Sequence, residues 1–262
     1  MFIIGELING MYKNIGKAIK EKDKSIIQKC ALEQIKAGAD ALDVNCGPAS
    51  ANPVSDIQWL VQAIQEVTNK PLAIDSSKPQ VIESGLKAVK NKAIINSTTA
   101  DMEKLNVLVP MAKKYNATLI GLTISAKGIP QNKDQRLELA AVIAGVCTDN
   151  NFPLEDLYLD PIVMPVNVAQ AQMKDILEAI HEFKIITDPP IKTIVGLSNV
   201  SQGTCARSLI NRTFATMAVG FGLDGAILDP LDSELVDSLI TAELILSKQI
   251  YCDSFLTAYR KK

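Results

Sequence analysis

Apolar positions along the chain fall into eight short, nearly continuous runs separated by longer stretches of mixed character. The runs begin at Phe2, Ala41, Pro71, Lys92, Ala117, Leu157, Thr193 and Gly225. Each run has the length of a strand, whereas the segments between them carry apolar residues at the spacing of an amphipathic helix, as in 57–67 and 176–183. The pattern predicts a strand followed by a helix, repeated eight times.

Continuous apolar runs are typical of strands covered on both faces, and helical connections between them indicate parallel pairing. A (β/α)8 TIM barrel satisfies both features in 262 residues, and we expect one domain over residues 1–262. A doubly wound open sheet is the alternative, but the sequence GELING at 5–10 lacks the G-x-G-x-x-G turn expected after its first strand. The polar stretch 129–136 is expected to be a surface loop.

Charge and cysteine usage exclude several classes of protein. Lys and Arg (27) nearly balance Asp and Glu (29), without a basic stripe, so we expect no nucleic-acid partner. The five cysteines are scattered, which predicts reduced thiols and neither an iron–sulfur cluster nor a structural zinc. No stretch reaches the roughly 18 apolar residues of a membrane helix, and no basic leader is recognised, so a soluble cytoplasmic protein is expected.

Polar residues stand where the apolar runs end. In a barrel of this type the carboxyl ends of the strands surround the active site, so such residues should converge on one mouth. The residues concerned are Asp43, Asn45, Asp75, Asn96, Asp160, Ser198, Asn199 and Asp229.

Each of these positions also has a purely structural interpretation. Asp75 could cap the following helix, and Asn96 could form a side-chain turn. Asp160 and Asp229 each precede a proline, which is a common way to open a turn. Asp43 lies inside its run and could be a buried, hydrogen-bonded barrel residue.

A mouth rich in carboxylates and amides, without clustered Lys or Arg, suits a ligand with many N–H donors and would repel a phosphate sugar. A divalent cation is an alternative, but no familiar ligand spacing accompanies the aspartates, and no tightly bound metal is expected. The only histidine, His181, falls in a helical segment and is expected to be a surface or packing residue. Cys46 either enters the mouth or packs as a small apolar side chain.

Several motifs, in order along nearly the whole chain, resemble those of the pterin-binding methyltransferase family. They are GELIN at 5–9, ALDVNCGP at 41–48, LAIDSS at 72–77, AIINSTTA at 93–100, LYLDPIV at 157–163 and GLSNVSQG at 196–203. The set is most similar to that of the methyltetrahydrofolate:corrinoid/iron–sulfur protein methyltransferases of the reductive acetyl-CoA pathway.

This resemblance implies a reaction, its participants and a set of site residues. The methyl group on N-5 of methyltetrahydrofolate would pass to cobalt(I) of a corrinoid carried by a separate iron–sulfur protein, and the chain would form a homodimer. Asn199 matches the residue that hydrogen-bonds near N-5 and would be catalytic. The matching substrate-binding residues are Asp75, Asn96, Asp160, Gly196, Ser198, Gln202 and Ile227, while Arg207 meets the folate tail or an acidic partner or is solvated.

Two other functions remain open on the sequence. One is a dihydropteroate synthase-like condensing enzyme, although the acidic stretch 225–234 stands where that enzyme would place basic residues. The other is a non-catalytic folate-binding module. The cobalamin signature D-x-H-x-x-G is absent and no zinc-thiolate site is recognised, so we expect the corrinoid on another protein and no methionine synthase chemistry.

Overall fold

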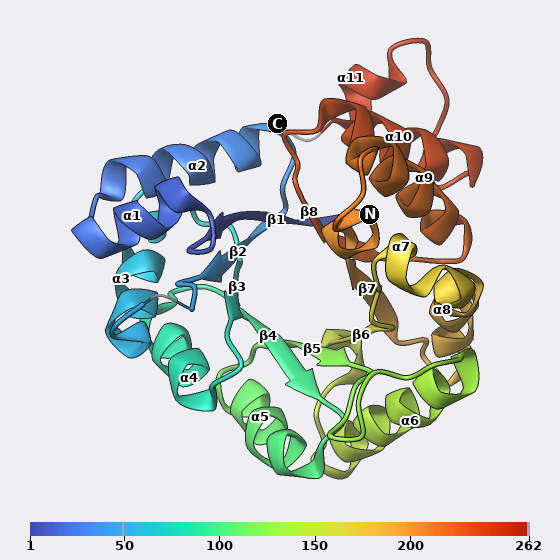
Figure 1. Cartoon of the computed structure of the whole chain (residues 1–262), viewed down its shortest axis with the longest axis horizontal. Coiled ribbons are helices and arrows are strands. Elements are labelled where there is room, and N and C mark those ends of the chain that lie inside the picture. Colours follow the sequence, from blue (N-terminus) through green and yellow to red (C-terminus); the bar gives the residue numbers. More distant parts are fainter. Residues whose placement is uncertain (49, 261–262) are drawn as a thin grey trace.

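A computed structural model describes residues 1–48 and 50–260 of the chain. Its eight strands form a closed barrel in which every neighbouring pair is parallel and β1 also pairs with β8 (Figure 1). The strands are β1 (Phe2–Asn9), β2 (Ala41–Asn45), β3 (Leu72–Asp75), β4 (Ile94–Thr99), β5 (Thr118–Leu122), β6 (Leu157–Asp160), β7 (Lys192–Gly196) and β8 (Gly225–Leu228). The expected (β/α)8 TIM barrel is confirmed, and closure between β1 and β8 excludes the open sheet.

Helices surround the barrel on its outside (Figure 1). The α-helices are α1 (Lys13–Glu21), α2 (Lys24–Lys36), α3 (Pro53–Gln65), α4 (Pro79–Ala88), α5 (Met102–Lys114), α6 (Lys133–Asp149), α7 (Val166–Ala169), α8 (Met173–Glu182), α9 (Arg207–Gly220), α10 (Ser233–Ile245) and α11 (Phe255–Tyr259). Short 3₁₀-helices are η1 (Leu154–Asp156), η2 (Gln170–Gln172), η3 (Phe183–Ile185) and η4 (Leu197–Ser201). No helix among the described residues is long and apolar enough to span a membrane.

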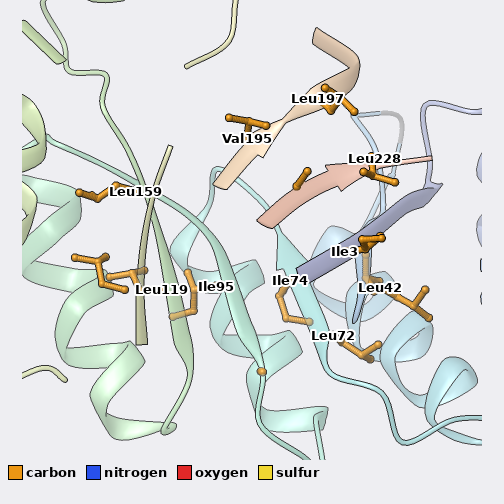
Figure 2. Close-up of a cluster of buried hydrophobic side chains, with 14 of the residues drawn as sticks. Ile3, Leu42, Leu72, Ile74, Ile95, Leu119, Leu159, Val195, Leu197 and Leu228 are labelled. Carbon is orange, nitrogen blue, oxygen red and sulfur yellow. The ribbon is translucent and has the colours of Figure 1, made fainter. Parts of the chain in front are cut away.

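Alternate residues of each strand face opposite sides of the barrel wall, so the strands build two apolar layers. Side chains such as Leu42, Ile74 and Ile95 belong to the large cluster between strands and helices, part of which Figure 2 shows. The inner layer fills the barrel and consists of Ile4, Ala41, Ala73, Ile94, Ile120 and Ile194.

The same alternation places the polar residues of the strands. Two residues beyond each inner-layer side chain, the next position faces the interior again, closer to the carboxyl end. These next positions are Glu6, Asp43, Asp75, Asn96, Leu122 and Gly196, and all of them line one cavity. The site is therefore the next inward-facing layer of the barrel, in which four of these six positions carry polar side chains in place of aliphatic ones.

The stretch 129–136 differs from the expected surface loop. Helix α6 begins at Lys133, and the Arg136 side chain is fully buried. Its guanidinium donates hydrogen bonds to the backbone oxygens of Pro161 (2.8 Å) and Asn132 (3.0 Å) and to Gln172 Oε1 (2.9 Å). These hydrogen bonds connect α6 to the segments that follow β6 and allow the Arg136 guanidinium to be buried. Local polarity along the sequence does not predict contacts between such segments.

Candidate functional site

A cavity of about 320 Å³ opens at the carboxyl ends of the strands. Four carboxylates and three amides line it, and aliphatic side chains from β5, β8 and the loop after β6 complete its wall. The polar residues are Glu6, Asp43, Asp75, Asp160, Asn9, Asn96 and Asn199, with Tyr12, Ser97 and Ser198; the others are Leu122, Ile162, Val163, Gly196 and Ile227. No Lys, Arg or His is among these lining residues.

Asp160 ends β6 and is a buried carboxyl held by the backbone. Its Oδ1 accepts a hydrogen bond from the N–H of Ile162 at 2.7 Å, and the N–H of Gly196 also donates to the carboxylate. Burial raises the pKa of Asp160 to about 6 despite these two donors. Ile162 adopts φ +64°, a sparsely populated region for a β-branched residue, and the bond from its N–H supports this turn.

Asp43 and Asp75 lie on neighbouring strands and form a pair of carboxyls, of which Asp43 is buried and Asp75 partly buried. Asn96 Nδ2 donates to Asp43 Oδ1 at 2.9 Å, and Asn45 Nδ2 donates to Asp75 Oδ2 at 2.6 Å. The pKa of Asp43 lies well above its ordinary value because the side chain is desolvated and faces the Asp75 charge; Asn96 opposes the shift. Burial also raises the pKa of Asp75. Two adjacent carboxyls in one apolar-walled site favour sharing a proton.

Glu6 of β1 connects the first strand to the loop after β7. Its Oε1 accepts a hydrogen bond from Ser198 Oγ at 2.6 Å. Burial is the main cause that raises the pKa of Glu6, while the Ser198 bond and Arg207 oppose the rise. The contact fixes Ser198 beside the cavity, next to Asn199 in the sequence.

Asn199 lies on η4, the single turn that follows β7. Its side chain is exposed to the cavity, and no side chain or backbone group of the described residues hydrogen-bonds its amide. The turn itself is secured by Arg207, whose Nη2 donates to the backbone oxygen of Ser198 (3.3 Å) and whose Nε donates to Ser201 Oγ (3.2 Å). Asn199 is thus an unengaged amide on a fixed support, available to a ligand.

The structure brings most of the sequence-predicted residues together and leaves some apart. Asp43, Asp75, Asn96, Asp160, Gly196, Ser198, Asn199 and Ile227 all line the cavity. Gln202 and Arg207 are exposed residues outside its lining, and Asn45 lines a neighbouring cavity of about 410 Å³ that shares Asp75. His181 is exposed at the end of α8, as expected, and Cys46 is buried in the apolar core.

The structural alternatives for individual residues have mixed outcomes. Asp75 does not cap α4, whose cap position is Lys78, because its carboxylate accepts from Asn45 inside the barrel. Asp229 does form a turn, in which its Oδ1 accepts from the N–H of Leu231 at 2.9 Å. Asp160 both forms a turn with Ile162 and borders the cavity.

Sequence reasoning missed several lining residues, among them Glu6, Asn9, Tyr12 and Leu122. Glu6 and Leu122 were detectable, because each stands two positions after an inner-layer residue, Ile4 and Ile120 respectively. Tyr12 belongs to the β1–α1 connection, whose path no periodic pattern predicts.

The arrangement is suited to a flat, nitrogen-rich ligand. Carboxylate and amide oxygens accept hydrogen bonds from N–H groups, and aliphatic side chains can pack on ring faces. Among residues 1–48 and 50–260, no group of three or more His, Cys, Asp or Glu side chains is arranged to hold a metal ion.

Comparisons with known proteins agree with this chemistry. The profile of the family described as pterin binding enzyme matches residues 13–229. The chain is 30% identical over 266 residues to a methylcorrinoid:tetrahydrofolate methyltransferase of Eubacterium limosum, a match that covers 100% of this chain and 97% of that protein. It is 26% identical over 216 residues to a methionine synthase of Mycobacterium leprae (strain TN), covering 77% of this chain but 18% of that protein.

Among solved structures, a Yersinia pestis dihydropteroate synthase in complex with a sulfonamide drug has the same fold. The TM-score is 0.68 with 14% sequence identity, covering 95% of this chain and 94% of the other. That likeness extends to the fold alone. The profile match and the full-length similarity to the E. limosum protein show that the chain belongs to the pterin-binding enzyme family and is one of its methyltransferases.

Proposed function

We propose that this protein transfers a methyl group between N-5 of methyltetrahydrofolate and the cobalt of a corrinoid carried by a separate protein. The observation that carries the proposal is the layer of hydrogen-bond acceptors at the carboxyl ends of the strands, made of Asp75, Asn96 and Asp160. The pyrimidine edge of a pterin presents an exocyclic amine and ring N–H groups, which buried carboxylates and an amide oxygen can accept. An analogue without these donors would leave the buried acceptors unpaired.

The methyl transfer is an in-line displacement at carbon. Cobalt(I) supplies both electrons of the new Co–C bond and becomes methylcobalt(III), while the N-5–CH₃ bond breaks and nitrogen keeps its electron pair. The departing nitrogen is a poor leaving group until it is protonated, so N-5 must gain a proton or a strong hydrogen bond.

Asn199 is the residue that we assign to this activation. Its amide cannot act as an acid near neutral pH, but its oxygen can accept from protonated N-5, or it can orient a water that carries the proton. An oriented dipole of this kind contributes on the order of 10²- to 10³-fold in rate. Its position on η4, fixed by Arg207 and free of other partners, supports the role.

Exposed apolar side chains around the cavity mouth support docking of a partner that carries a large ring. Met11 and Leu231 lie in the connections after β1 and β8, Val168 lies on α7 after β6, and Leu209 lies in the first turn of α9 after β7; all four are exposed. We call these four residues the rim collar. A corrinoid held by its own protein must approach N-5 through this mouth, and an apolar collar is suited to contact the edge of the macrocycle. The motifs resemble those of enzymes whose partner is a corrinoid/iron–sulfur protein, and we propose that class of partner.

The same site can support methyl transfer in either direction. The name of the E. limosum relative makes the methylcorrinoid the donor and tetrahydrofolate the acceptor, opposite to the direction written above. Forward and reverse transfer share one transition state, so the same residues stabilise both.

A pterin-condensing reaction like that of dihydropteroate synthase has less support. Such a reaction must hold a pyrophosphate group, and the described lining of the cavity contains no Lys or Arg. Incubation with hydroxymethylpterin pyrophosphate and aminobenzoate tests it directly, because only a synthase would yield dihydropteroate.

The decisive experiment mixes the protein with methyltetrahydrofolate and a reduced corrinoid protein and follows the absorbance of cobalt. The proposal predicts conversion of cobalt(I) to methylcobalt(III) that requires the enzyme, and a slower single turnover for Asn199→Ala with unchanged folate affinity. Folate binding without any methylation would favour the non-catalytic module instead. Full single-turnover activity in Asn199→Ala would remove Asn199 from the mechanism.

The resemblance also favours a homodimer, and we propose the outer surface between α9 and α10 as its interface. A cavity of about 460 Å³ there is mostly apolar, with exposed Ile245 and Leu246 on its wall. Light scattering of the purified chain, compared with an Ile245→Glu variant, tests this arrangement: the variant should be monomeric and the parent dimeric.

A further inference from the structure

The four side chains Asn45, Asp75, Asp43 and Asn96 form a continuous hydrogen-bonded row across β2, β3 and β4, which we call the carboxyl row. Asn45 Nδ2 donates to Asp75 Oδ2 (2.6 Å), the Asp75 and Asp43 carboxyls are within hydrogen-bonding reach of each other, and Asn96 Nδ2 donates to Asp43 Oδ1 (2.9 Å). The register brings Asp75 directly beside Asn96.

Only one placement of the protons and one orientation of each amide satisfy the hydrogen bonds of the carboxyl row. The Asn45 amide is oriented by the backbone, because its Oδ1 accepts from the N–H of Gly47 at 2.7 Å and its Nδ2 must therefore point to Asp75. Asp75 is then an acceptor towards Asn45. Two ionised carboxylates in contact would repel each other, so a proton must lie between Asp43 and Asp75.

That proton belongs on Asp43. Asp43 is the more deeply buried of the two, with 3% of its surface exposed, and it faces a second acid, Glu6, in addition to Asp75. Asp75 already receives an amide donor from Asn45, which favours its ionised form. The Asp43 hydroxyl thus points to Asp75, and the remaining Asp43 oxygen can only accept.

An accepting Asp43 oxygen determines how Asn96 is oriented. The Asn96 amide must turn its Nδ2 to Asp43, so its Oδ1 has no partner among the described residues. Asn96 Oδ1 is not among the buried polar atoms that lack a partner, and Asn96 borders the cavity. Asn96 Oδ1 is therefore accessible to a ligand. The row therefore presents an acceptor, not a donor, at this point of the wall.

We infer that Asp43 is a positioning residue, which holds the proton shared with Asp75 and orients Asn96 so that Asn96 Oδ1 accepts an N–H of the bound ligand. The inference deepens the proposed function and rests on it for the identity of the ligand. The two neighbouring aspartates then have different protonation states. Asp75 is an ionised carboxylate, whereas Asp43 is a neutral carboxylic acid whose hydroxyl donates to Asp75 and whose carbonyl oxygen accepts from Asn96.

Replacing each aspartate in turn by asparagine distinguishes the protonated residue from the ionised one. In Asp43→Asn, the new amide can donate to Asp75 and accept from Asn96, so it reproduces protonated Asp43. In Asp75→Asn, the new amide can accept from Asn45 and donate to Asp43 only if Asp43 loses its proton, which moves the negative charge from residue 75 to the more deeply buried Asp43. If Asp43 keeps its proton, one amide oxygen must accept from both Asn45 and Asp43. Asp43→Ala removes the support of Asn96 altogether.

Calorimetric titration with 5-methyltetrahydrofolate at pH 7.5 tests the inference. We expect Asp43→Asn to bind within about threefold of the parent, and Asp75→Asn and Asp43→Ala to bind at least about tenfold more weakly. In the Asp43→Ala, Asn96→Ala double variant the two losses should not add, because they remove one interaction. An Asp43→Asn variant as weak as Asp43→Ala, or the opposite order of the two Asn variants, would overturn the inference.

Thermal unfolding without ligand gives a second readout that does not depend on the proposed function. Asp43→Asn should melt at or above the temperature of the parent, and Asp75→Asn should melt below it. If the parent fails to bind the folate but this order of melting temperatures holds, the proposed function is wrong and the proton assignment stands. If the folate binds and the order of the two variants is reversed, the assignment is wrong.

Discussion

Gly196 and Asn199 face each other so closely that a Cβ atom at residue 196 would stand 3.0 Å from Asn199 Nδ2. Glycine at the end of β7 therefore leaves the space that the Asn199 amide occupies. We predict that Gly196→Ala displaces this amide and slows single-turnover methyl transfer, by up to the roughly 10²-fold that one oriented dipole contributes, with a smaller effect on folate affinity.

The matched control for this change is Gly145→Ala on α6, where an added Cβ meets no heavy atom within 4 Å. Stopped-flow absorbance of the corrinoid gives the transfer rate for both variants. Gly145→Ala should retain the parental rate and gain a little stability, since alanine is favoured in helices. Equal rates for Gly196→Ala and the parent would show that Asn199 needs no such space.

Stability should increase when the Asp160 charge is removed. Burial raises the pKa of Asp160 from 3.8 to about 6, so its contribution to stability is fully present below pH 3.8 and is lost as pH rises through about 6. The difference between the two values corresponds to about 3 kcal/mol at most. Asp160→Asn should therefore unfold at higher denaturant concentration than the parent at pH 8.

The same comparison at low pH serves as the control for the Asp160 variant. Near pH 4 the parent carboxyl is protonated when folded, and the difference in midpoint between parent and Asp160→Asn should become small. A stability advantage that is independent of pH would mean that the charge of Asp160 is not its source.

Ligand affinity should depend on pH through the same carboxyl. A pterin that donates N–H groups prefers ionised Asp160, so affinity should fall as pH drops through about 6, by about tenfold between pH 8 and pH 5. Isothermal titration across this range measures the effect, and Asp160→Asn should lack this part of the dependence. An identical pH profile in both proteins would assign the titration to the ligand or to another acid.

The rim collar should matter for the protein partner and not for the folate. Leu209, with 66% of its surface exposed, is the residue to change, and Leu209→Asp should raise the KM for the corrinoid protein severalfold while leaving folate affinity unchanged. Ile185 is a suitable control because it is similarly exposed (72%) but lies on η3, in the connection that leads into the amino end of β7. Equal effects of Leu209→Asp and Ile185→Asp would argue against docking at the collar.

The sequence was sufficient to predict the barrel because eight short apolar runs alternate with segments that carry apolar residues at helical spacing, as in α3 and α8. It also placed Asp75, Asn96 and Asp160 at one mouth, since carboxyl ends of parallel strands must meet there. Glu6 was missed because an acid inside an apolar run was not treated as the next inward-facing position after Ile4. Contacts between segments far apart in the sequence, such as the hydrogen bond from Ser198 on η4 to Glu6 on β1, depend on barrel closure, which no local pattern predicts.

Arg136 is a charged residue that the sequence placed on the surface and the structure places in the interior. A charged residue in a polar stretch is ordinarily solvated, and only the assembled fold supplies the Pro161 backbone oxygen and Gln172 Oε1 that accept from its guanidinium. Residues whose partners lie on distant segments are therefore the ones that the sequence alone does not place.

The affinity of Asp160→Asn for 5-methyltetrahydrofolate at pH 8 shows whether the acids and amides of the barrel mouth hold a pterin. The variant keeps the shape of the parent side chain, is expected to be at least as stable, and replaces one accepting oxygen by a donor. We expect a dissociation constant at least about tenfold higher than the parental one, because a hydrogen bond to a charged group contributes about 1.5 to 3 kcal/mol. A dissociation constant within twofold of the parental one, about the precision of such titrations, would contradict it.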